Sequence, residues 1–261
     1  MNAKPVILFA ALTLVLHLLL PPPPARAQNH STADSLIVSI QRDLETLRGK
    51  RFKHPVKVRN QSLAEFGRYL DRMLDKQFPE KLRKNYGKIV KKLGLYRGPE
   101  ITDFKALAKM VMQSQAAAYY DPETKTFYVV MQNLPAQTLQ AVYAHELYHG
   151  LQDQYFDLQH YVLAPRGANL SDDELMARQA VVEGEATFIM TAWSLRKMFG
   201  NKPADSILEM AINAPAQMDA TQLMEMVKRN ALPLAQSAEM KNAAAALEKI
   251  PRFLLETLVG A

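Results

Sequence analysis

The segment VYAHELYHGL, residues 142–151, limits what this chain can fold into more than any other. It contains one acidic residue, Glu146, and no Lys or Arg, whereas a helix that faces solvent would carry more charges. We therefore expect a buried helix. His145 and His149 lie on one face of that helix, because residues four apart are neighbours, and Glu146 lies one step around. The fold then has to bury two imidazoles and a carboxylate close together.

This spacing is the H-E-x-x-H pattern, in which two histidines on one helix face bind a metal ion and the glutamate serves as a base. Zinc suits such a site, because it lowers the pKa of a water molecule that a carboxylate can then deprotonate. The alternative is that the two histidines merely share a packed helix face. Because the chain has no cysteine, a metal here depends on histidine and carboxylate ligands.

A third protein ligand is expected from the segment ARQAVVEGEATFIM, residues 177–190, because the sequence contains no second histidine pair. Glu183 and Glu185 stand two positions apart in this apolar segment. That spacing is about 200° on a helix, so only one of the two can face the metal. An unpaired acid in an apolar helix is costly, so at least one of them should have a positively charged partner. The spacing alone leaves the choice open.

HELYH followed on a later helix by EGEAT resembles the gluzincins, zinc peptidases whose third ligand is a downstream glutamate. The resemblance implies that His145, His149 and Glu183 bind one Zn²⁺ and that water fills the fourth position. It also implies that Glu146 is the general base for peptide hydrolysis, with a peptide or unfolded protein as substrate. More narrowly, over residues 45–200 the chain is similar to a group of exported bacterial proteins that combine YYDP, HExxHxLQDQ and EG[DE]AT.

The residues that would assist such a site are less well defined. Many gluzincins have an aspartate four residues after the glutamate ligand that orients a histidine, and this chain has Thr187 there. Asp153 or Gln152 is the candidate for that role, although a solvent-facing aspartate is the simpler interpretation of Asp153. No Tyr or His follows Glu183, so a donor that stabilises the oxyanion is expected upstream or from an arginine. The candidates are Tyr120, His160, Tyr161 and Arg178.

The first 27 residues have the order of a secretory signal peptide: Lys4, an apolar run over 6–20, four prolines and then Ala25-Arg26-Ala27. We expect cleavage after Ala27 and a periplasmic or secreted protein. An uncleaved anchor is the alternative, but the apolar run is short for a membrane span. The remaining chain divides into a basic N-terminal helical region, 28–95, and a zincin-like metal-binding region, 96–261, which we expect to form one compact domain.

Positive charge is concentrated in residues 41–92, which contain 16 Lys and Arg against six Asp and Glu. Such a block can bind an anionic membrane surface, although a solvated helical face that complements the acidic remainder explains it too. We expect no nucleic-acid partner. Two alternatives to a peptidase stay open. One is a zinc-binding envelope chaperone or scaffold that no longer cleaves, and the other is an interaction module that uses residues 41–92 without a metal.

The periodicity of apolar residues predicts a predominantly α-helical α+β fold, with a zincin-like metal helix and a small β element. Capping-box patterns at Ser62 and Ser171 mark two helix starts, and Gly200 marks the end of the second helix. The segment AAYYDPETKTFYVVMQ, residues 117–132, reads as a β-hairpin that turns at Asp121-Pro122-Glu123-Thr124. We expect a loop over residues 160–170 and two or three weaker helices at the end of the chain. In zincins an edge strand before the metal helix often holds the substrate, and KTFYVVM, residues 125–131, is the candidate.

Overall fold

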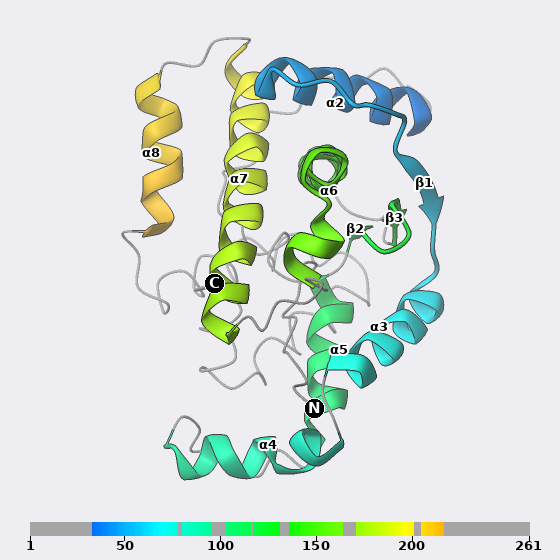
Figure 1. Cartoon of the computed structure of the whole chain (residues 1–261). Coiled ribbons are helices and arrows are strands. Elements are labelled where there is room, and N and C mark those ends of the chain that lie inside the picture. The colour runs from blue at the N-terminus through cyan, green and yellow to red at the C-terminus, as the bar shows by residue number, and fades with distance from the viewer. Residues whose placement is uncertain are drawn as a thin grey trace.

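The computed structural model describes residues 33–77, 80–94, 103–115, 117–130, 136–163, 171–200 and 205–216 (Figure 1). The expected signal peptide lies outside these ranges, as does the chain after residue 216 with most of the expected late helices. None of the helices within these ranges is long and apolar enough to cross a membrane. The expected predominantly helical α+β class is confirmed.

The helix starts expected at Ser62 and Ser171 and the helix end expected at Gly200 lie close to the observed positions. In chain order they are α2 (Ala33–Arg48), β1 (Lys57–Asn60), α3 (Leu63–Gln77), α4 (Glu80–Lys92), α5 (Phe104–Gln115), β2 (Ala118–Asp121), β3 (Thr126–Val129), α6 (Ala136–Phe156), η1 (Gln159–Leu163), α7 (Asp172–Phe199) and α8 (Asp205–Ala216). The short π-helix η1 lies where we expected only a loop. Asp157, with φ of 49°, turns the chain after α6, and its carbonyl then accepts the amides of His160 and Tyr161.

Two capping boxes start the helices that the sequence marked. The Glu65 amide donates to Ser62 Oγ at 3.3 Å, and the Ser62 amide donates to the Glu65 carboxylate at 2.8 Å. Ser171 and Glu174 repeat both hydrogen bonds at the start of α7. Each pair satisfies amides that a helix start leaves without an internal partner. At the other end of α7, the amide of Gly200 donates to the Arg196 carbonyl at a positive φ that suits glycine.

The three strands form one sheet in the order β1-β3-β2. The predicted hairpin is confirmed: β2 pairs with β3 in antiparallel register, with Tyr119 opposite Tyr128. Strand β1 joins the other side of β3 in parallel, with Val58 opposite Phe127. Strand β3 is therefore the central strand of the sheet. The expectation that KTFYVVM is an edge strand is wrong, because neighbours occupy both of its hydrogen-bonding edges.

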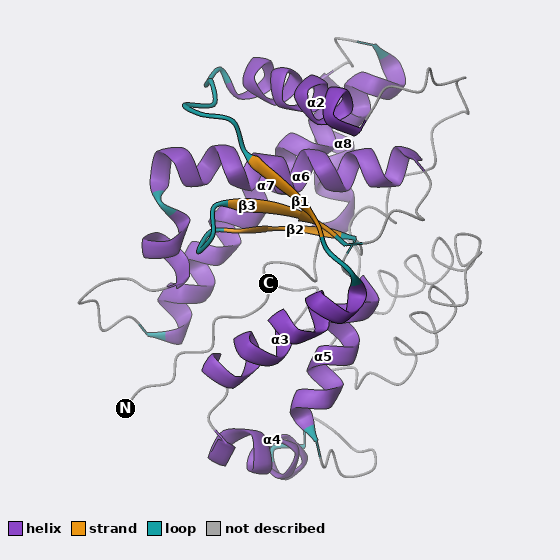
Figure 2. Ribbon diagram, turned by 90° about the vertical axis from the view of Figure 1, so that its right-hand side faces the viewer, coloured by secondary structure: helices purple, strands orange, loops and turns teal. Residues whose placement is uncertain are grey.

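Helices cover both faces of this sheet (Figure 2). Tyr120 and Phe127 point to the face that packs on α6, α2 and α7. Tyr119 and Tyr128 point to the opposite face, where Tyr119 packs with Phe66 of α3. Because successive strand residues alternate between faces, β2 and β3 each supply both cores, whereas the four residues of β1 are exposed. Tyr119, Tyr120 and Phe127 are buried, and Tyr128 is half-buried against the second core.

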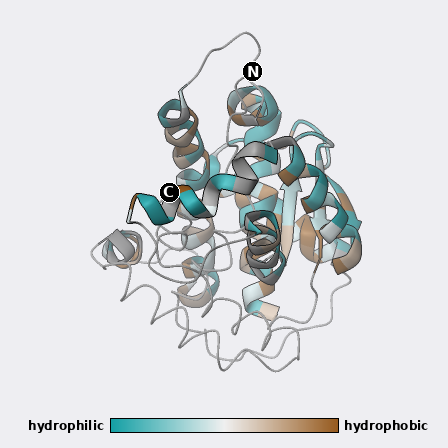
Figure 3. Ribbon diagram, turned by 90° about the horizontal axis from the view of Figure 1, so that it is seen from below, coloured by the Kyte–Doolittle hydropathy of each residue, from teal (hydrophilic) through white to brown (hydrophobic). Residues whose placement is uncertain are grey.

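The second of these cores shows how amphipathic helices build the outer layer. Phe66, Leu70 and Leu74 of α3 recur every four residues and are fully buried, and they pack with Met112 of α5. Four-residue spacing places them on one face of the helix, and the remaining faces carry polar residues. Figure 3 shows this mixture of hydrophilic and hydrophobic residues along the helices.

Helix α6 is buried on every side at its centre: residues 141–153 are all buried. The sheet, α7 and α2 each contact it. Leu147 and Leu151 of α6 share one hydrophobic cluster with Ile40 and Leu44 of α2. The predicted burial of the helix is confirmed. The N-terminal helix α2 is thus part of the core that surrounds the two histidines (Figure 1).

We expect Ser171→Ala to lower the free energy of unfolding by about 1 kcal/mol, because the start of α7 loses its capping hydroxyl. Ser171→Thr keeps a hydroxyl at the same position and should stay within a few tenths of a kcal/mol of the wild type. Urea unfolding followed by circular dichroism measures both. Equal losses in the two variants would show that the hydroxyl does not stabilise α7.

Candidate metal centre

Helices α6 and α7 bring three side chains of the predicted site together. His145 Nε2 lies 2.9 Å from His149 Nε2 and 3.2 Å from Glu183 Oε2. His149 Nε2 lies 3.5 Å from the same carboxylate oxygen. All three residues are buried, and one ligand atom of each falls within 4.8 Å of the others. We refer to these three residues as the triad.

One positive charge balances the carboxylate within the triad. Burial lowers the pKa of His145 to about 4, so this ring is neutral at pH 7. Burial also tends to lower the pKa of His149, but the charge of Glu183 outweighs it and raises the pKa to about 9. Burial tends to raise the pKa of Glu183, yet the charge of His149 holds it down to about 2. A proton on His149 thus supplies the single positive charge that a metal ion would replace.

One further atom, the second carboxylate oxygen of Glu183, indicates that the triad suits a cation. Glu183 Oε1 and His145 Nδ1 are buried and have no hydrogen-bond partner within the described ranges. A buried carboxylate oxygen without a donor is costly, and a metal ion would compensate it. Two imidazoles and one carboxylate form the donor set of catalytic zinc sites that keep a fourth position for water. The residues therefore fit zinc.

Glu146 lies in the same buried segment, one position after His145. The backbone amide of Tyr120 donates to Glu146 Oε2 at 2.8 Å. This hydrogen bond ties the carboxylate to strand β2 and fixes its orientation. The charge of Glu146 is also felt at His149, where it helps to raise the ring's pKa. The predicted base is accordingly a buried carboxylate beside the triad.

The structure separates the roles of the two glutamates on α7. Glu183 faces the two histidines. Glu185 points away from them, to Arg48 Nη2 at 2.7 Å and Gln152 Nε2 at 2.9 Å. The expectation that at least one of the two acids has a positively charged partner is met by Arg48. The helical spacing left open whether Glu183 or Glu185 faces the two histidines, and in the structure it is Glu183.

Of the two candidates for orienting a histidine, Gln152 is the one that contacts His149. Its Oε1 lies 2.8 Å from His149 Nδ1, and its Nε2 donates to the Val182 carbonyl at 3.0 Å. The alternative assignment of this role to Asp153 is wrong. The expectation of a solvent-facing Asp153 is also wrong, because this carboxylate is buried.

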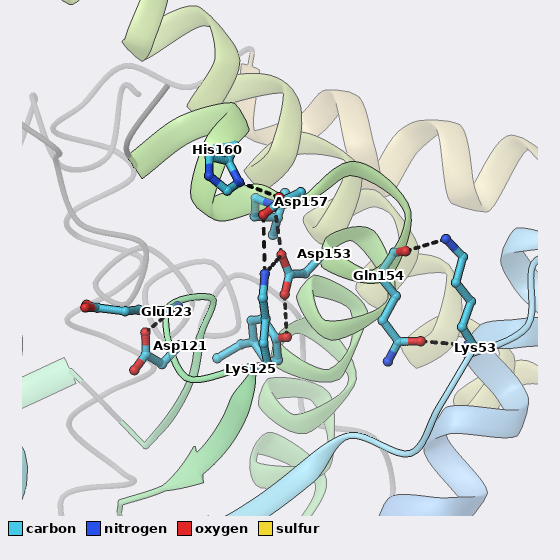
Figure 4. A network of polar contacts seen from close by, with 10 residues as sticks. Lys53, Asp121, Glu123, Lys125, Asp153, Gln154, Asp157 and His160 are labelled. Atoms are coloured by element: carbon cyan, nitrogen blue, oxygen red, sulfur yellow. Dashed lines mark hydrogen bonds and ion pairs between the residues drawn. The ribbon is translucent and has the colours of Figure 1, made fainter. Parts of the chain in front are cut away.

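Asp153 instead joins the β-hairpin to the end of α6 (Figure 4). It accepts hydrogen bonds from the Tyr120 hydroxyl at 2.7 Å, Lys125 Nζ at 2.8 Å and the Leu158 amide at 2.8 Å. Lys125 lies in the hairpin turn and also reaches Asp157, whose side chain is exposed. This network holds Tyr120, and with it the amide that contacts Glu146, against the helix.

Three of the four predicted oxyanion donors, Tyr120, His160 and Arg178, make their hydrogen bonds to residues outside the triad. The Tyr120 hydroxyl donates to Asp153, and burial and that carboxylate raise its pKa. The His160 ring contacts the exposed Asp157 (Figure 4). Arg178 donates to the Tyr161 carbonyl at 3.1 Å, and its guanidinium lies 5.1 Å from the Tyr161 ring centre. The contacts that these side chains make thus lead to other parts of the fold.

Sequence reasoning missed two residues that support the site, Arg48 and Lys125. Each belongs to a segment far from the H-E-x-x-H motif, and each pairs with an acid that is buried or half-buried. The available signal was the acid itself, because an acid in an apolar helix implies a cation nearby. That signal does not say which of the chain's many Lys and Arg residues supplies it.

We expect Asp153→Asn to lower the free energy of unfolding by about 2 kcal/mol, because buried donors lose a charged acceptor. Asp157→Asn is the matched control: it also contacts Lys125, but its side chain is 52% exposed. Its loss should stay below about 0.5 kcal/mol. Urea denaturation of both variants measures the difference. Similar losses would show that burial of Asp153 does not determine its contribution.

We expect the purified protein to contain about one zinc ion per chain after supplementation, as three converging protein ligands predict. His149→Ala should lose it, whereas His160→Ala, which alters a histidine outside the triad, should keep it. Elemental mass spectrometry of the three proteins measures the ratio. Zinc retained in His149→Ala, or absent from a folded wild type, would contradict the triad as a metal centre.

No family model matches this chain, and no curated protein or solved structure matches it. The resemblance to gluzincins therefore rests on the motif residues, and the metal centre rests on the geometry of the triad.

Proposed function

We propose that this chain is an exported zinc-dependent peptidase. The observation that carries the proposal is the meeting of His145, His149 and Glu183 in a buried cluster, with Glu146 adjacent to it. This donor set and this carboxylate are what hydrolysis by an activated water requires. The proposed export rests on the N-terminal 27 residues of the sequence.

The proposal gives each residue one task. A zinc ion held by His145 Nε2, His149 Nε2 and Glu183 would polarise the scissile carbonyl and acidify a water molecule. Glu146 accepts the proton of that water as its oxygen attacks the carbonyl carbon. The C–N bond then breaks, and Glu146 delivers the same proton to the departing amine nitrogen. The base thus ends the reaction as it began, as a carboxylate.

The position of Tyr120 supports this assignment. Its amide holds one oxygen of Glu146, while its hydroxyl is anchored two helical turns further on by Asp153. Strand β2 is thereby fixed to α6 at two points. A base that stays in one orientation loses less freedom when it takes up a proton from water.

A second candidate function is zinc binding without hydrolysis, in a chaperone or scaffold. Two observations favour it: Tyr120, His160 and Arg178 direct their side chains to other partners, and the triad and Glu146 are at most 4% exposed. A metal that is closed off from solvent contributes to folding, whereas peptide hydrolysis also needs an oxyanion donor. The two candidates predict the same zinc content and differ in turnover.

Glu146→Gln separates the two functions. The variant should keep about one zinc per chain, since the triad is intact, and should hydrolyse an unfolded protein such as fluorescein-labelled casein about 10²- to 10⁴-fold more slowly, because the general base is lost. Release of labelled fragments measures the rate.

The control is Glu174→Gln, which alters an exposed glutamate in the first turn of α7. It should leave the rate unchanged. Unchanged turnover in Glu146→Gln would refute the role of the base. A zinc-loaded wild type that cleaves neither casein nor other unfolded substrates would favour the non-hydrolytic function.

A further inference from the structure

The amide of Gln152 has a single allowed orientation. Its nitrogen lies 3.0 Å from the Val182 carbonyl oxygen and 2.9 Å from Glu185 Oε2. Both partners are acceptors, so the group that faces them has to be the NH₂. The oxygen of the amide must then be the atom 2.8 Å from His149 Nδ1. A flipped amide would place acceptor against acceptor at both contacts, one buried and one half-buried.

This orientation determines where His149 carries its proton. Gln152 Oε1 is an acceptor, so His149 Nδ1 has to be the donor. A neutral imidazole with its proton on Nδ1 has its lone pair on Nε2. That atom is the one that faces His145 and Glu183. Gln152 thus presents His149 in the tautomer that binds a metal through Nε2.

The orientation of Gln152 depends in turn on Glu185 and Arg48. One oxygen of Glu185 accepts from Gln152, and the other contacts Arg48 Nη2 at 2.7 Å. Arg48 is the last residue of α2, and its Nε donates to the Tyr148 hydroxyl at 2.9 Å. The guanidinium of Arg48 is therefore held at two points. It fixes the carboxylate of Glu185, which in turn fixes the amide of Gln152. The contacts run from α2 through α7 to α6.

We propose that Arg48 and Glu185 are positioning residues for the metal ligand His149 and act through the amide of Gln152. The inference rests on the proposed function, because it takes zinc binding by the triad from it. It assigns a task to Glu185, the second acid of EGEAT, which does not face the metal. It also assigns a task to the N-terminal helix, which ends at Arg48. Zinc affinity then depends on an ion pair that has no contact with the metal.

A double-mutant cycle tests the relay. Zinc affinity is measured by competition with a chromophoric chelator for the wild type, Arg48→Met, Gln152→Leu and the double variant. We expect Gln152→Leu to weaken zinc binding about 10- to 100-fold, and Arg48→Met about tenfold. The double variant should bind zinc no more weakly than Gln152→Leu alone, because Arg48 acts only through that amide. Multiplied losses would overturn the relay.

Lys197→Met is the matched control. Lys197 contacts Asp43 at 2.7 Å and so forms another ion pair between α7 and α2, although its side chain is 49% exposed against 34% for Arg48. Its loss should change zinc affinity less than about twofold, since an exposed pair contributes little. If Lys197→Met weakens zinc binding as much as Arg48→Met, then general loosening of α2 explains the effect, and the proposal fails. Thermal unfolding of each variant identifies any that does not fold.

A spectroscopic measurement reports the tautomer directly. Long-range ¹H–¹⁵N correlation spectra of the histidine rings show which nitrogen of His149 carries a proton in the zinc-loaded protein. We expect Nδ1–H in the wild type, and a second ring environment for His149 in Arg48→Met. Coordination through Nδ1 would overturn the inference. A folded wild type that binds no zinc at all would instead refute the proposed function on which the inference rests.

Discussion

The complete burial of the centre of α6 is the constraint on which the rest of the structure depends. Five polar residues lie in this segment: His145, Glu146, His149, Gln152 and Asp153. Burying them without partners would cost several kcal/mol each. Their partners come from α7 and from strand β2 and its hairpin turn, and Arg48 of α2 contacts Glu185, which is one of those partners. The buried polar side chains of this one helix thus constrain how the neighbouring elements pack around it.

The polar groups near the two ends of this buried segment differ in how completely they are hydrogen-bonded. Asp153 receives three donors, one of them the charged Lys125, so both oxygens of this buried carboxylate are hydrogen-bonded. At the triad, by contrast, Glu183 Oε1 and His145 Nδ1 are two of the three buried polar side-chain atoms without a hydrogen-bond partner in the described ranges. Incomplete compensation in one place, within a helix that is otherwise well satisfied, is typical of a ligand site rather than of a structural network.

The parts of the fold that sequence reasoning predicted are those with local signals. The capping residues Ser62 and Ser171 and the turn after Asp121 act within a few positions of themselves, so the helix starts and the hairpin were predictable. The pairing of β1 with β3 was not, because parallel strands meet only through a long crossover. The central position of β3 follows from that pairing and was missed with it.

The candidate site divides in the same way. His145, His149 and Glu146 follow from helical spacing alone, and their burial follows from the uncharged residues around them. The choice between Gln152 and Asp153 depends on which faces of α6 meet α7 and the hairpin. Helical spacing places both near His149 and cannot tell them apart. The partners Arg48 and Lys125 depend on the tertiary arrangement and carry no local signal of their role.

The position of α2 has a consequence for how the chain folds. This helix is made early, yet its partners lie near the other end of the described chain, as the hydrogen bond from Trp193 to Asp43 across 150 positions shows. The ribosome synthesises α2 long before α7, so the apolar face of α2 cannot pack against α7 until α7 has been made. Contacts of such wide sequence separation slow folding, because the entropy cost of closing the long loop between them has to be overcome before they form. The triad itself joins only α6 and α7, and His145 and Glu183 stand 38 positions apart, so its side chains meet through a much shorter loop than the one that brings α2 into the core.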